Sequence, residues 1–98
     1  MGNNLNTNLN EKKAEIFKAL SNPIRLDVVD VLLNGEKCVC EIIEELKKYE
    51  QPNISKSLNK LKSVGIITSR KAGANVYYKL SMCCIKDFIR CLNKTLTD

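Results

Sequence analysis

Two short runs of β-prone residues, 66–71 and 76–80, interrupt a chain whose other apolar residues recur at helical spacing. The segment Ala72-Gly73-Ala74-Asn75 joins the two runs and supplies a glycine for the turn, so the pair predicts a β-hairpin. We therefore expect a mainly α-helical fold with one small β-hairpin.

Two helices are predicted in the first third of the chain. Asn8 and Glu11 resemble an N-cap pair, and the apolar residues after them predict a first helix of about ten residues. The segment Ser21-Asn22-Pro23 ends this helix, because the residue before a proline avoids helical backbone angles. A second helix follows and stops at Asn34-Gly35.

Three further helices complete the pattern. One starts near Lys37 and places apolar residues three and four positions apart. Gln51-Pro52 opens the next, because proline is tolerated in a first turn, and Gly65 is placed to cap its end. The last helix starts near Met82, after the hairpin. The order α-α-α-α-β-β-α is typical of a winged helix-turn-helix with a dimerisation helix.

The length of 98 residues indicates a single domain. We expect residues 1–8, which are rich in asparagine, to form a loose, flexible arm, and residues 9–98 to form the winged helix-turn-helix domain. A chain this short buries comparatively little of its surface alone, so we expect a homodimer. The apolar stripe of the last helix is the expected dimer interface: Ile85, Phe88, Ile89 and Leu92.

Charge and residue usage narrow the class of protein. The formal net charge of +5 favours a polyanionic partner. No apolar run approaches the roughly 20 residues needed to cross a bilayer, and the N-terminus lacks the apolar core of a signal peptide. We therefore expect a cytoplasmic protein with reduced cysteines. Histidine is absent, so any metal must be held by thiolate and carboxylate.

Four segments resemble the ArsR/SmtB family of metal- and metalloid-responsive transcriptional repressors. The segments are residues 19–26, similar to the junction of the family's first two helices, residues 35–42, similar to its cysteine-containing helix, residues 51–65, similar to its recognition helix, and residues 76–80, similar to its wing strand. The match covers about residues 16–80. It implies a homodimeric repressor, not an enzyme, that binds double-stranded operator DNA and needs no organic cofactor.

The outer face of the fourth helix carries the predicted base-reading residues. Asn53, Lys56, Asn59 and Lys60 lie roughly opposite its apolar stripe at about 100° per residue, and these residue types pair with base edges or phosphates. A solvated polar face is the alternative. The family often has Arg-His where this chain has Lys56 followed by serine, so the target sequence stays open. The predicted set also includes small or polar neighbours on the same helix, Gln51, Ser55 and Ser57. It is completed by three hairpin cations that would meet phosphates, Arg70, Lys71 and Lys79.

Cys38 and Cys40 are the predicted ligands of an inducing ion. Thiolates select thiophilic ions, and the resemblance implies As(III) or Sb(III) as the favoured inducers, with Cd, Pb or Zn as further candidates. On a regular helix, side chains two residues apart diverge by about 160°. We therefore expect ligation by both thiolates to loosen the first turn of the third helix and disturb the recognition helix after it. Packing beside the core is the alternative for these two small side chains.

The last helix holds three more cysteines, Cys83, Cys84 and Cys91. Cys84 and Cys91 share one edge of the apolar stripe, whereas Cys83 points nearly opposite. They could complete the metal site, form a second thiol pair or pack at a dimer seam. The family's other common site, which uses Asp and His on the last helix, is not expected in a chain without histidine.

Two other functions stay open. The same fold could be a redox- or reactive-sulfur-sensing repressor whose thiols form a disulfide or persulfide. The resemblance places one cysteine of such sensors in the second helix, where this chain has none. A thiol oxidoreductase or metal carrier belongs to a different class, and the absence of a Cys-x-x-Cys motif and of a βαβ pattern argues against it.

Overall fold

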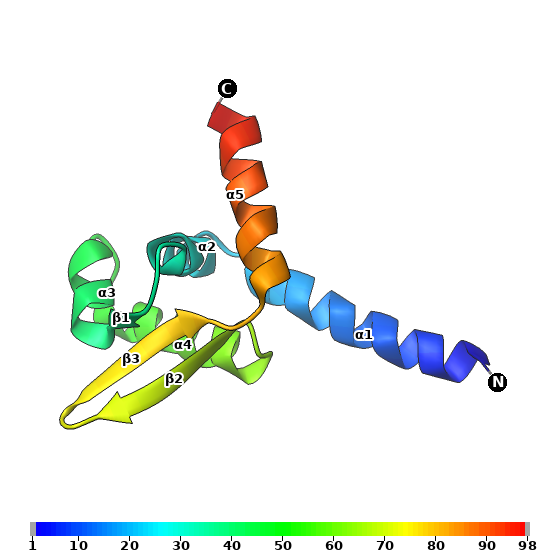
Figure 1. Ribbon diagram of the computed structural model, residues 1–98, viewed down its shortest axis with the longest axis horizontal. Coiled ribbons are helices and arrows are strands. Elements are labelled where there is room, and N and C mark those ends of the chain that lie inside the picture. The colour runs from blue at the N-terminus through cyan, green and yellow to red at the C-terminus, as the bar shows by residue number, and fades with distance from the viewer. Residues whose placement is uncertain (1, 98) are drawn as a thin grey trace.

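The computed structural model describes the backbone of residues 2–97 and the side chains of residues 8–97. Met1, part of the predicted arm, lies outside the described residues. The described residues form, in the order shown in Figure 1, α1 (Gly2–Leu20), α2 (Pro23–Leu32), β1 (Lys37–Cys38), α3 (Val39–Glu45), α4 (Gln51–Ser63), β2 (Ile67–Ala72), β3 (Asn75–Leu80) and α5 (Cys83–Thr97). This is the predicted order with β1 added between the second and third helices.

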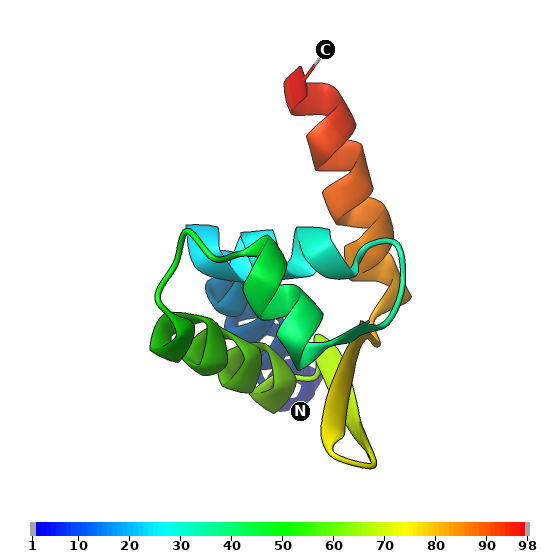
Figure 2. The ribbon, with the colours of Figure 1, turned by 90° about the vertical axis from the view of Figure 1, so that its left-hand side faces the viewer.

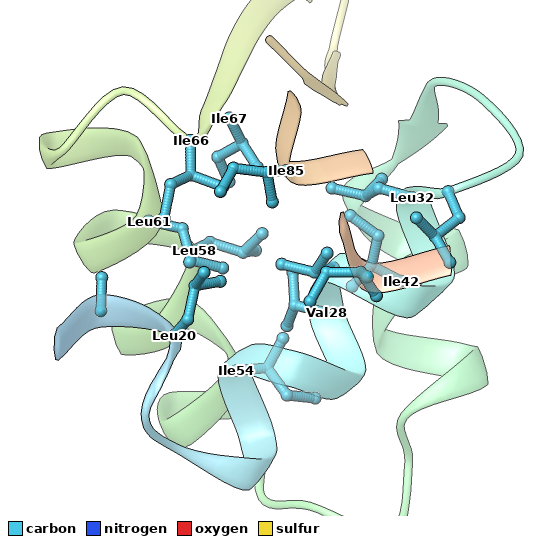
Figure 3. Packing of buried hydrophobic residues seen from close by; sticks show 14 of the residues in the cluster. Leu20, Val28, Leu32, Ile42, Ile54, Leu58, Leu61, Ile66, Ile67 and Ile85 are labelled. Atoms are coloured by element: carbon cyan, nitrogen blue, oxygen red, sulfur yellow. The ribbon is translucent and has the colours of Figure 1, made fainter. Parts of the chain in front are cut away.

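The hydrophobic core lies where α2, α3 and α4 meet the base of the hairpin (Figure 3). Leu32, Ile42 and Leu61 bring one fully buried side chain from each of these helices. Ile66 and Ile67 enter the same cluster from the start of β2. Each such burial stabilises the fold by about 1.5–3 kcal/mol, so the core fixes the helices and the hairpin as one body.

The helix α4 is fixed at both ends. At its C-terminal end Gly65 has a φ of 84°, and its N–H and that of Ile66 donate to the carbonyls of Lys62 and Leu61, each at 3.0 Å. These two bonds form a Schellman motif, which confirms the predicted cap. In the turn before α4, the Tyr49 hydroxyl donates a hydrogen bond to the carboxylate of Asp27 in α2. The helix therefore has a defined direction relative to α2.

The sheet is antiparallel with the strand order β1-β3-β2. Strands β2 and β3 form the predicted hairpin, and Ala72 pairs with Asn75 at its tip. Strand β1 was not predicted, because two residues carry no periodicity. It pairs Lys37 with Tyr78 and Cys38 with Tyr77. The prediction that the third helix starts near Lys37 is therefore wrong in detail: α3 starts at Val39, after the strand.

Both terminal helices project from the body in Figure 1. α1 begins at Gly2, so residues 2–8, predicted as an arm, lie in the helix, and Asn8 does not cap it. At the other end, Arg90 Nη2 donates to the carbonyl of Leu33 at 3.0 Å, which attaches α5 to the end of α2. Among the described residues, none of the helices combines the length and the apolar content needed to span a membrane.

Candidate DNA interface and thiol pair

The helix α4 lies on the same side of the molecule as the hairpin, opposite the C-terminus (Figure 2). The members of the predicted set that are exposed on this helix are Gln51, Asn53, Ser55, Lys56 and Asn59. Their side chains are free to meet a groove, because the buried Ile54, Leu58 and Leu61 hold the opposite face of the helix in the core.

Two residues of the predicted set on α4, Ser57 and Lys60, are not on its exposed polar face. Ser57 is only 6% exposed, and its hydroxyl donates to the carbonyl of Asn53 at 2.9 Å. It therefore belongs to the inner face of the helix, and its prediction as a DNA contact is wrong. Lys60 is half-buried and lines an open pocket of about 480 Å³ beside Lys12 and Glu15 of α1.

The hairpin carries its cations on different faces. Lys71 and Lys79 are exposed, and Lys79 pairs with Thr68 whereas Lys71 pairs with Val76. Arg70 differs from both, because its Nε and Nη2 atoms donate to the two carboxylate oxygens of Glu36, each at 2.8 Å. This hydrogen-bonded guanidinium lowers the pKa of Glu36 below its ordinary value. The side chain predicted to meet a phosphate is therefore already engaged.

Cys38 and Cys40 lie together. Cys38 is the last residue of β1 and the N-cap of α3, with an extended backbone (φ −69°, ψ 148°), and Cys40 lies in the first turn of α3. Their Sγ atoms are 2.8 Å apart and share a hydrogen bond. The expectation that the two side chains diverge by about 160° is wrong, because it assumed that both residues are helical. The thiols meet while α3 is intact.

The thiol pair is polarised in a definite direction. The hydrogen bond from Cys40 lowers the pKa of Cys38, and the backbone N–H groups of Cys40 and Glu41 act in the same sense. The same thiol–thiol hydrogen bond raises the pKa of Cys40. Cys38 is 5% exposed and Cys40 is exposed, so one sulfur is inside the protein surface and the other faces solvent. Cys38 is therefore the thiol that ionises first.

Glu41 fixes the backbone at this site. Its carboxylate accepts a hydrogen bond from the backbone N–H of Cys38 at 2.8 Å, which closes a capping box at the start of α3. Glu41 was not among the predicted site residues. Its position three residues after Cys38 is the signal that could have identified it, because a capping box needs Glu or Gln at that spacing.

The cysteines of α5 do not join the pair. Cys83, Cys84 and Cys91 are exposed on a helix that stands well apart from α3 in Figure 1. Within the part of the chain that the structure describes, no group of three or more Cys, Asp or Glu side chains is arranged to hold a metal ion. One chain thus offers two thiols at Cys38 and Cys40.

The fold buries two of the four residues predicted to form the dimer interface and leaves the other two exposed. Ile85 and Ile89 are 7% and 3% exposed and belong to the chain's own core, so they are not available to a partner. Phe88 and Leu92 are 45% and 36% exposed. Phe17 on α1 is exposed as well, at 60%. The apolar surface left uncovered therefore spans both projecting helices.

The comparisons with known proteins agree on one family. The family model for bacterial regulatory proteins of the arsR family matches residues 22–69. An uncharacterised helix-turn-helix transcriptional regulator of Methanocaldococcus jannaschii is 56% identical over 70 residues, which cover 69% of this chain and 78% of that protein. The arsenical resistance operon repressor of Staphylococcus aureus is 35% identical over 78 residues, which cover 80% of this chain and 74% of the repressor.

A solved structure supports the same fold. The homodimeric winged helix-turn-helix DNA-binding domain of a possible ArsR-family regulator from Mycobacterium bovis superposes with a TM-score of 0.81 at 26% sequence identity. The superposition covers 94% of this chain and 84% of that one. The hairpin is therefore a wing, and α3 and α4 are the helix-turn-helix.

Proposed function

Because the chain belongs to the ArsR family of bacterial regulatory proteins, we propose that it is a homodimeric repressor that leaves its operator when a thiophilic ion binds Cys38 and Cys40. The observation that carries the proposal is the 2.8 Å separation of the two Sγ atoms. Two soft donors that already meet need no unfolding of α3 to act together on one ion.

The donor set favours As(III) or Sb(III) over the other candidate ions. A three-coordinate ion needs one donor beyond Cys38 and Cys40, whereas a tetrahedral ion such as Zn(II) needs two. Among the described residues, no group of three or more Cys, Asp or Glu side chains includes the pair, so the smaller donor requirement of a three-coordinate ion is the easier one to meet. The relative in Staphylococcus aureus is named an arsenical resistance operon repressor, which favours the same choice. Cd, Pb and Zn are the other candidates.

Binding changes the geometry around the pair. Ligation replaces the hydrogen bond between the two thiols by two bonds of about 2.3 Å to one ion, so the relative position of the two sulfurs is set by the ion. Cys38 belongs to β1, which pairs with the wing strand β3, and Cys40 belongs to α3, which leads into α4. A change in the relative position of the two sulfurs therefore acts on both the wing and the recognition helix. The ion stabilises a form with poorer DNA geometry, which is ligand-biased selection between two states.

DNA binding is assigned to α4 and the wing. Asn53, Lys56 and Asn59 are exposed for base contacts, and Lys71 and Lys79 for phosphates. Dimerisation through the exposed apolar faces of α1 and α5 places two recognition helices in successive major grooves. The operator is then an imperfect palindrome with half-sites about one helical turn apart.

The same thiol separation favours a second candidate, a redox-sensing repressor. In that reaction the thiols of Cys38 and Cys40 lose two protons and two electrons to hydrogen peroxide, one S–S bond forms, and the O–O bond breaks to yield two water molecules. The exposed Cys40 is accessible to the oxidant. Release by peroxide in the absence of metal distinguishes this candidate from the ion sensor.

Operator release in reducing buffer tests the proposal. Arsenite, antimonite, cadmium, lead or zinc is added to the protein–operator complex, and the dissociation constant is measured by fluorescence anisotropy. Cys38→Ser/Cys40→Ser should bind the operator as the parent does and no longer release it, because serine preserves volume but removes the soft ligands. The matched control, Cys83→Ser/Cys84→Ser/Cys91→Ser, should still release. If the first variant releases like the parent, the site assignment is wrong.

A further inference from the structure

Glu36 and Arg70 form an ion pair with two hydrogen bonds. The pair joins the segment that precedes Cys38 to the wing. Arg70 Nε lies 2.8 Å from Glu36 Oε2, and Nη2 lies 2.8 Å from Oε1. The planar fork of arginine meets a carboxylate in one orientation, so the two parallel bonds fix direction as well as distance. The pair therefore holds β2 at a set position relative to residue 36.

The sheet order makes this pair a bridge. Because the order is β1-β3-β2, no backbone hydrogen bond joins β1 directly to β2. Glu36 immediately precedes β1, and Arg70 lies in β2, so their side chains connect the two outer strands across β3. This contact therefore links the position of β1 to that of β2.

The bridge spans the cross-strand row that contains Cys38. In register, Cys38 pairs with Tyr77, and Tyr77 pairs with Arg70. Residues in such a row lie on one face of a sheet. The Arg70 guanidinium lies over the Tyr77 ring at 4.7 Å from its centroid. The row is therefore continuous from the buried thiol to the side chain that Glu36 holds.

Stability does not explain this arrangement. Both side chains are partly exposed, at 57% for Arg70 and 30% for Glu36, and exposed ion pairs contribute only about 0–1 kcal/mol. A phosphate contact does not explain it either, because the carboxylate occupies the Nε edge that a phosphate would use. The pair instead fixes the position of Arg70 relative to Glu36.

We propose that the Glu36–Arg70 ion pair transmits occupancy of the Cys38–Cys40 pair to the wing, which makes both residues positioning residues for operator release. This inference rests on the proposed function and extends it. Displacement of Cys38 moves β1, Glu36 moves with it, and the two hydrogen bonds carry Arg70 and β2 along. Without the pair, the thiols change but the outer strand of the wing stays where DNA requires it.

Two conservative substitutions test the link. Glu36→Gln removes the charge of the acceptor, and Arg70→Lys keeps the positive charge but cannot form two parallel bonds. Glu44→Gln is the matched control, because it makes the same charge change at an exposed carboxylate that pairs with Lys47. Operator dissociation constants are measured with and without arsenite for the parent and each variant.

The ratio of the two dissociation constants is the release factor, about 5- to 150-fold for couplings of the usual size. We expect Glu36→Gln and Arg70→Lys to show a release factor below about two, whatever their operator dissociation constants without arsenite. Glu44→Gln should keep the parent's factor. If either bridge variant releases as fully as the control, the proposed link is overturned.

A second readout separates failure of the link from failure of the proposed function. In the Cys83→Ser/Cys84→Ser/Cys91→Ser background, iodoacetamide alkylation of Cys40 is timed with and without operator and without any ion. Operator should change this rate in the parent and not in Glu36→Gln. Steric protection by DNA would persist in Glu36→Gln, because that variant still binds, and an unchanged operator effect in it overturns the link. If no ion releases the parent protein from the operator, the proposed function is wrong. The effect of the operator on the alkylation rate then tests the Glu36–Arg70 link without any ion.

Discussion

The Sγ atoms of Cys38 and Cys40 lie 2.8 Å apart although the two residues are separated by a single valine. The contact exists because Cys38 has an extended backbone at the end of β1, while Cys40 is helical. A change from strand to helix between two cysteines turns side chains that would diverge on a helix into neighbours. The properties of the pair therefore depend on β1 as much as on α3.

The two thiols should titrate at different pH values. In the Cys83→Ser/Cys84→Ser/Cys91→Ser variant, ultraviolet thiolate absorbance should rise in two steps, one below and one above the ordinary thiol pKa. The hydrogen bond from Cys40 lowers the pKa of Cys38, so adding Cys40→Ser should raise the lower pKa toward the ordinary value. Adding Cys38→Ser should lower the pKa of Cys40. A single step at the ordinary thiol pKa would contradict the contact.

Substitutions on α4 and the wing should affect DNA binding in two different ways. Asn53→Ala and Lys56→Ala should each cost about 1–3 kcal/mol on the operator and relax sequence preference, because these exposed side chains are the ones proposed to contact base edges. Lys71→Ala should weaken binding to operator and random DNA alike and reduce the salt dependence. Ser57→Ala should change neither, because Ser57 is buried. Competition with random DNA at several salt concentrations measures both effects, and equal losses for all four variants would exclude the assignment.

Substitutions at two neighbouring residues of α5 distinguish the proposed dimer surface from the core. Phe88→Asp places a charge on a side chain that is 45% exposed, so it should yield a folded monomer with weak operator binding. Ile89→Asp, one residue on, places the charge in a side chain that is 3% exposed and should unfold the chain. Sedimentation and circular dichroism distinguish the two outcomes. A parent protein that sediments as a monomer at micromolar concentration would remove the dimer from the proposal.

The cap of α4 should tolerate asparagine better than alanine. Gly65 has a φ of 84°, a backbone conformation that costs most L-residues about 1–2 kcal/mol. A Cβ at this position would lie 3.6 Å from Met82 Cε, which is an ordinary contact, so strain and not a clash sets the cost. Gly65→Ala should therefore lower the free energy of unfolding in urea by that amount, and Gly65→Asn by less. Equal costs would argue that packing decides instead.

Local signals predicted most of the fold. The breaks at Asn22 and Gly65 and the hairpin around Gly73 were all predicted from residues within a few positions of each other. Capping, turn and periodicity preferences act over one or two helical turns, which is why they can be read without a structure. The error at α1 has the same origin, because the Asn8–Glu11 pattern has the form of a cap but lies inside a longer helix.

The sequence by itself determined the order of helices and hairpin, the polar face of α4 and the presence of two cysteines close to the start of the third helix. Only the tertiary structure decided that those cysteines touch, because the extended backbone of Cys38 is stabilised by pairing with Tyr77, which lies far along the chain. It also decided that Ile85 and Ile89 belong to the core while Phe88 stays exposed, since burial depends on where α5 meets α2. The role proposed for Glu36 also depends on the tertiary structure. Its partner, Arg70, is brought to it by the sheet, and a contact between distant segments leaves no periodic signal in the sequence.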